Sequence, residues 1–123
     1  MLKLLLDEHI SPDVAAGMRR RDRQVTVWSL VEWEGGNYLG KEDSACLREA
    51  AIQELTLVTY DRRTIPSLLK RWAEEGLHHA GVILVDEKTV SQESIGGLVQ
   101  SLCMLVKDVG HWDWTDRIYF LRR

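Results

Sequence analysis

The chain has 123 residues, of which 45% are hydrophobic and 28% charged, so it is long enough for one globular domain with a buried core. Its formal net charge of −3 gives no general attraction to nucleic acid, so any such binding requires a local basic patch. No apolar run approaches the roughly 18 residues of a membrane span, and the apolar start soon meets Asp7, so we expect a single domain over residues 1–123, in the cytoplasm and off the membrane.

The first half of the chain alternates strand-like and helix-like segments. The apolar run Leu2 to Asp7 predicts a strand. Ser11-Pro12-Asp13 is typical of a helix start, because a serine N-cap, a proline in the first turn and an early acid all favour one. A helix is therefore expected over about residues 12–21, followed by a strand over residues 24–30 and a loop over residues 34–37.

The second half continues the same alternation. We expect helices over residues 42–54, 66–75 and 92–107, and strands over residues 55–60, 80–85 and 117–121. This order predicts an α/β fold of three layers, α/β/α, with a mainly parallel central sheet of about five strands and right-handed crossovers.

Three acidic residues stand at corresponding positions of this predicted fold. Asp7 and Asp61 end apolar strand-like runs, and Asp43 opens a helix-like segment. The carboxyl ends of parallel strands lie at the same edge as the N-termini of helices that follow strands, so we expect the three carboxylates to meet at one crevice. Clustered carboxylates repel unless a proton or a hard cation intervenes, and oxygen ligands suit Mg²⁺ or Mn²⁺. The pattern therefore favours metal-assisted phosphoryl chemistry.

Three segments that contain these acids resemble a known family. Leu4-Leu5-Leu6-Asp7-Glu8, the run from Asp43 to Ala51, and Leu57-Val58-Thr59-Tyr60-Asp61 are similar to the motifs of PIN-like domains, and to the short PIN-like group of unknown function DUF5615, often associated with toxin-antitoxin systems. The resemblance covers about the first two thirds of the chain. It implies a PIN-like fold and the toxin component of a toxin-antitoxin system, with a cognate antitoxin as partner.

The resemblance also implies the roles of particular residues. Asp7, Asp43 and Asp61 match the catalytic acids that hold one or two divalent ions, Mg²⁺ or Mn²⁺, and Thr59 matches a supporting hydroxyl. The implied reaction is endoribonucleolytic cleavage of single-stranded RNA by a metal-activated water. Ordinary PIN domains carry a further glutamate that has no clear counterpart here. Glu8 or Glu42 is the candidate replacement, and Glu8 must lie beyond the strand end to serve, because successive strand residues point to opposite faces.

Other polar residues have weaker functional interpretations. Arg62 and Arg63 adjoin Asp61 and are the candidates for contacting RNA phosphates, whereas Lys70 and Arg71 fit a solvated helix face equally well. His9 follows the acidic pair and is expected to be solvated. His78-His79 is expected at the surface, and Asp86-Glu87 is expected to cap a turn or border the crevice.

The cysteines and tryptophans are interpreted as structural. Cys46 and Cys103 are isolated in the sequence, which favours two reduced, mostly buried thiols over a disulfide or a zinc site. The five tryptophans are expected to complete the core and a protein interface, in a homodimer or with the antitoxin, rather than to stack on bases.

Three alternatives remain open. Each acid taken singly fits a capping role, and a non-catalytic PIN-like domain that only binds a partner protein fits the missing glutamate and the negative charge. A receiver-like phosphoacceptor domain would use Asp7-Glu8 as an acidic pair and Asp61 as the acceptor. It needs a lysine that closes the fifth strand, but Lys107 falls in a predicted helix.

Overall fold

The computed structural model describes residues 1–122 and has the expected α/β architecture. The elements in chain order are β1 (Lys3–Leu6), α1 (Pro12–Arg21), β2 (Thr26–Ser29), a short 3₁₀ helix (Trp33–Gly36), α2 (Asp43–Ile52), β3 (Thr56–Thr59), α3 (Thr64–Glu74), β4 (Val82–Val85), α4 (Ile95–Val109) and β5 (Ile118–Leu121). The predicted order of strands and helices is confirmed, with shorter strands and a 3₁₀ helix in place of the expected loop.

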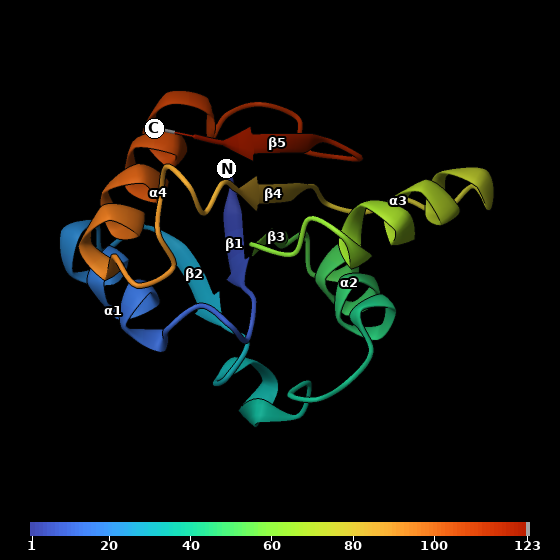
Figure 1. Ribbon diagram of the computed structural model, residues 1–123, viewed down its shortest axis with the longest axis horizontal. Coiled ribbons are helices and arrows are strands. Elements are labelled where there is room, and N and C mark those ends of the chain that lie inside the picture. The colour runs from blue at the N-terminus through green and yellow to red at the C-terminus, as the bar shows by residue number, and fades with distance from the viewer. Residues whose placement is uncertain (123) are drawn as a thin grey trace.

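The five strands form one parallel sheet in the order β2-β1-β3-β4-β5. In Figure 1, α1 and α4 lie on one side of the sheet and α2 and α3 on the other. This is a three-layer α/β/α arrangement, as the sequence predicts. No helix within residues 1–122 has the length and apolar character needed to cross a membrane.

Alternation along the strands builds a separate core on each face of the sheet. Leu4 and Leu6 pack with α1 and α4, whereas Leu5 packs with α2 and α3. All three leucines are fully buried, as expected for a parallel sheet covered on both sides. By the same alternation, Asp7 continues the face of Leu5 and therefore points toward α2.

The last crossover differs from the sequence expectation. The connections through α2 and α3 run along the sheet toward β5, and both helices lie on the same face. The connection through α1 runs in the opposite direction, and its helix lies on the other face. Reversing both the direction and the face keeps the handedness, so these three connections have the same hand. The connection from β4 to β5 moves in the direction of the α2 and α3 connections, but α4 packs on the α1 face. The expectation that all crossovers are right-handed is therefore wrong for this one. As a consequence, no helix within residues 1–122 covers β5 on the α3 side.

Two smaller expectations are also resolved. Helix α3 begins at Thr64 rather than Pro66, because a proline is tolerated in the first turn, where its missing N–H has no partner within the helix. Both cysteines are free, Cys46 buried and Cys103 partly so. Three of the five tryptophans, at positions 33, 72 and 114, are in the core, which confirms their structural interpretation and leaves the interface a prediction.

Candidate functional site

The sheet topology brings the ends of β1 and β3 to one place. These two strands are neighbours, but the chain leaves β1 toward α1 on one face and leaves β3 toward α3 on the other. Loops that diverge in this way open a crevice at the carboxyl edge of the sheet, which is the usual ligand position in doubly wound folds. Asp7 directly follows β1 and Asp61 lies two residues after the end of β3.

The hydroxyl of Thr59 ties the ends of β1 and β3 together. It donates a hydrogen bond to Asp7 Oδ2 over 2.7 Å and accepts one from the backbone N–H of Asp61 over 3.0 Å. Thr59 is completely buried, while the other carboxylate oxygen of Asp7 accepts from the Glu8 N–H over 2.7 Å. The position of Asp7 is therefore fixed by the fold.

Asp61 has a structural role at the start of α3. Its Oδ1 accepts hydrogen bonds from the backbone N–H groups of Arg63 over 3.0 Å and Thr64 over 2.8 Å, as in an N-cap. Burial opposes ionisation, but these backbone bonds, Thr64 first and then Arg63, outweigh it and lower the pKa of Asp61. The capping alternative is thus confirmed for Oδ1.

Asp43 lies half-buried in the first turn of α2 and is affected by the other acids. Partial burial is the largest cause of its raised pKa, followed by the charges of Asp7, Asp61 and Glu8, which His9 offsets in part. Burial, then the charges of Asp43, Asp7 and Glu8, likewise raise the pKa of Cys46 to about 11. The crevice therefore holds an excess of negative charge.

The acids interact but do not form a preformed metal cage. Within the described residues, no group of three or more His, Cys, Asp or Glu side chains is arranged so that it could hold a metal ion. Glu8 is exposed and lies beyond the end of β1, as its candidate role requires, and Glu42 is an exposed residue immediately before α2. Thus Asp7, Thr59 and Asp61 are joined by hydrogen bonds, and Asp43 is linked to them by charge alone.

Basic residues border the acidic crevice on two sides. One open hollow is lined by Asp61, Arg62 and Arg63, and Arg62 also lies 3.6 Å from Asp86. A second hollow, between α2 and α3, is lined by Asp43 and Arg71. Sequence reasoning left Arg71 undecided, although its spacing of seven residues from Thr64 places both on the same side of α3.

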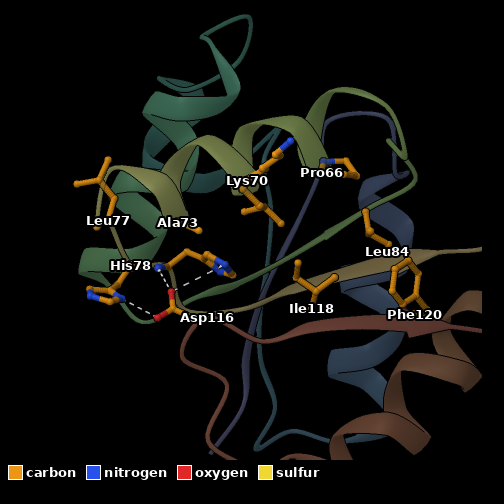
Figure 2. Close-up of a pocket in the computed structure, with 12 residues that line it drawn as sticks. Pro66, Lys70, Ala73, Leu77, His78, Leu84, Asp116, Ile118 and Phe120 are labelled. Carbon is orange, nitrogen blue, oxygen red and sulfur yellow. Dashed lines mark hydrogen bonds and ion pairs between the residues drawn. The ribbon is translucent and has the colours of Figure 1, made fainter.

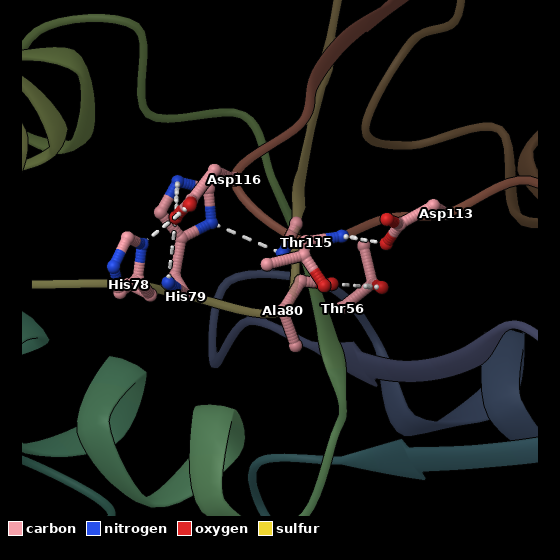
Figure 3. Close-up of polar contacts among 8 residues, drawn as sticks. Thr56, His78, His79, Ala80, Asp113, Thr115 and Asp116 are labelled. Carbon is pink, nitrogen blue, oxygen red and sulfur yellow. Dashed lines mark hydrogen bonds and ion pairs between the residues drawn. The ribbon is translucent and has the colours of Figure 1, made fainter.

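A second polar cluster lies at the opposite, amino-terminal edge of the sheet (Figure 3). His78 Nδ1 lies 2.6 Å from Asp116 Oδ2, and the backbone N–H of His79 donates to Asp116 Oδ1 over 3.0 Å. The expectation that both histidines are at the surface is wrong for His79, which is buried and whose Nδ1 accepts the Gly81 N–H over 3.0 Å. His79 contacts Asp116, which lies two residues before β5, and no local sequence pattern predicts this contact.

The polar groups of this second cluster bond to one another. Burial lowers the pKa of His79, against the opposing charge of Asp116. Burial acts to raise the pKa of Asp116, but hydrogen bonds from His79 and His78 lower it overall. This cluster therefore satisfies its own polar groups, unlike the crevice at the other edge.

Comparison of the chain with protein-family models, with curated proteins and with solved structures gave no match. The chemistry of the crevice must therefore support any functional assignment.

Proposed function

We propose that the protein is a Mg²⁺- or Mn²⁺-dependent endoribonuclease of PIN-like type that cleaves single-stranded RNA, as the toxin component of a toxin-antitoxin system. The observation that carries the proposal is the Thr59 hydroxyl, which bonds to both the carboxylate of Asp7 and the backbone N–H of Asp61 at the switch point of the sheet. Partial burial, followed by the charges of Asp7 and Asp61, raises the pKa of the nearby Asp43. Like charges maintained at such a position favour the binding of a cation.

The residues present fit a hard cation by their chemistry. The side chains that face the crevice offer carboxylate oxygens, the ligands that Mg²⁺ and Mn²⁺ prefer. Asp7, Asp43 and Asp61 would hold the ion, with the Thr59 hydroxyl fixing the Asp7 carboxylate. A bound divalent ion lowers the pKa of a water and stabilises the leaving oxygen of a phosphodiester.

The chain's other residues would orient the substrate. Arg63, and Arg62 after release from Asp86, would contact phosphates on one side of the scissile bond, and Arg71 on the other. These cations are local, which is what a chain with a net charge of −3 requires for RNA binding.

The test is cleavage of a labelled single-stranded RNA by the purified protein with Mn²⁺. We expect slow cleavage that EDTA stops and that Asp7→Asn removes without unfolding the protein, because Asn retains the shape of the side chain while the charge is lost. Asp108→Asn changes an exposed acid on α4 and should keep the activity. Equal cleavage by wild type and Asp7→Asn would identify a contaminating nuclease.

The strand order favours one second candidate. The order β2-β1-β3-β4-β5 is common among doubly wound folds, and it places Asp7-Glu8 after β1 and Asp61 after β3. The receiver mechanism needs a lysine at the end of β5, but Lys107 lies within α4. The residue that follows β5 is Arg122, an arginine in place of the required lysine. Acetyl phosphate should phosphorylate Asp61 if the domain is a receiver, which a phosphate-affinity gel of wild type and Asp61→Asn would detect.

A failure of both assays would favour the remaining alternative. Within the described residues no group of three or more potential ligands is arranged to hold a metal ion. The PIN-like domain would then be non-catalytic and would act only by binding a partner protein. A homodimer and a cognate antitoxin remain predictions under either PIN-like interpretation.

A further inference from the structure

The outer edge of β5 is open for strand pairing. β5 is the last strand of the sheet, and in the part of the chain that the structure describes no strand pairs with its other side. The carbonyls of Arg117 and Leu121 accept hydrogen bonds from the N–H groups of Val82 and Asp86. Because strand residues alternate in the direction of their backbone groups, Ile118 and Phe120 direct their N–H and C=O groups outward.

The side chains of the same two residues form one wall of an apolar groove. Helix α4 packs on the α1 face, so Ile118 and Phe120 remain 43% and 52% exposed on the α3 side. A groove of about 470 Å³ runs between β5 and α3, with Leu69, Leu77 and Leu84 among its apolar lining. Figure 2 shows Leu84, Ile118 and Phe120 side by side along it, across from Pro66 and Lys70.

Positive charge flanks this edge. Arg117 and Arg122 stand immediately before and after β5, and both are exposed. Lys70 also lines the groove. Among the described residues that line the groove, the one carboxylate is that of Asp116, and His78 Nδ1 lies 2.6 Å from it. A partner with apolar side chains and acidic ends is therefore complementary to the edge.

We propose that β5 is a docking edge for an extended segment of another protein, which adds a sixth strand. Its alternate apolar side chains enter the groove beside Ile118 and Phe120, its backbone pairs with theirs, and acidic residues at both ends contact Arg117 and Arg122. This surface is independent of the acidic crevice and of the proposed nuclease activity.

The test uses a fluorescent peptide, Asp-Glu-Ile-Thr-Leu-Thr-Glu-Asp, whose four central residues match the length of β5. We expect saturable binding by anisotropy, with NMR shifts at the amides of Ile118 to Leu121. A peptide with every acid changed to lysine should bind at least ten-fold more weakly. Two further peptides carry N-methyl groups, one on its Ile and Leu residues and the other on its two Thr residues. A strand directs the N–H groups of only alternate residues toward its neighbour, so one of these two peptides should bind at least ten-fold more weakly.

Matched variants locate the site. Arg122→Glu and Phe120→Thr should each weaken binding about ten-fold, whereas Arg23→Glu, an exposed charge reversal on the far side of the sheet, should leave it unchanged. Absence of binding at millimolar peptide, equal binding of the acidic and basic peptides, or no effect of either N-methylated pair would overturn the proposal. So would sedimentation of the protein as a dimer that Phe120→Thr dissociates, since a second copy would then occupy the edge.

Discussion

The polar groups at the two ends of β3 have different partners. At the amino end, the Thr56 hydroxyl donates to the carbonyl of Ala80 over 2.7 Å, beside a cluster in which Asp116 is paired with histidines. At the carboxyl end, the Thr59 hydroxyl donates over the same distance to the carboxylate of Asp7. There Asp43 meets mainly like charges. The amino edge is completed by the chain's own groups, whereas the carboxyl edge has charge left for an external cation.

The largest expected difference between the edges is their response to metal. Mg²⁺ or Mn²⁺ should raise the melting temperature, because an ion that binds only the folded crevice stabilises it by about 2.7 kcal/mol at a concentration 100 times its Kd. Asp61→Asn should abolish the rise, and since Asn also caps helices well, α3 should remain intact. Differential scanning fluorimetry with each chloride salt measures both effects.

Asp116→Asn provides the control at the amino edge. Asp116 already bonds to His78 and to the His79 N–H. The variant should therefore still show the rise in melting temperature with Mg²⁺ or Mn²⁺, even if its own melting temperature is lower. An equal rise in wild type and Asp61→Asn would mean that the ions act nonspecifically and that the contrast between the edges is wrong.

The two threonines allow a matched comparison. Thr59→Val and Thr56→Val each remove one buried hydroxyl from β3, so each should lower the free energy of unfolding by about 1–3 kcal/mol. Only Thr59→Val frees Asp7, so only this variant should also weaken the metal response. Urea titrations with and without Mn²⁺ separate the two effects. Equal losses of metal response would show that Thr59 does not position the site.

Local patterns were sufficient to predict the fold class and most of the crevice. The apolar runs that end at Asp7 and Asp61 define strands, and the strand-edge rule then places both acids at one crevice. Thr59 was predicted only through the family resemblance, and the structure gives it the bond to Asp7. The metal and the reaction remain predictions.

Features that depend on long-range packing could not be predicted from the sequence. The side of the sheet that α4 covers decides whether Phe120 is exposed, and the apolar stripe of α4 does not specify which face of the sheet it packs on. His79 is buried because Asp116, 37 residues further along the chain, approaches it. Such contacts leave no periodic signal in either segment.

Acidification should lower the free energy of unfolding through His79 at the amino-terminal edge of the sheet. The pKa of buried His79 lies below its ordinary value of 6.5, so the unfolded chain binds this proton first and stability falls as the pH drops below about 6.5. One proton contributes at most about 1.4 kcal/mol per pH unit. His79→Asn retains an acceptor for the Gly81 N–H and should flatten this fall in urea titrations between pH 7 and 5. The exposed His111→Asn should not, and if it flattens the fall equally, His79 is not the responsible group.

The smallest expected effect concerns Asp43, whose pKa is shifted in the opposite sense. Because its pKa is raised above 3.8 in the folded protein, the folded state takes up this proton first, and stability contributed at this position rises as the pH falls toward 3.8. Asp43→Asn should therefore stabilise the metal-free protein slightly at neutral pH, by roughly 0.5 kcal/mol as for a mild surface change, and the gain should shrink on acidification and in high salt. The opposing term is the favourable interaction of an acid with the first turn of a helix. Urea titrations at pH 7 and 4.5 decide which term is larger. If Asp43→Asn destabilises the protein at pH 7 without a cation, the carboxyl edge is as self-sufficient as the amino edge, and the electrostatic reason for placing a metal there is lost.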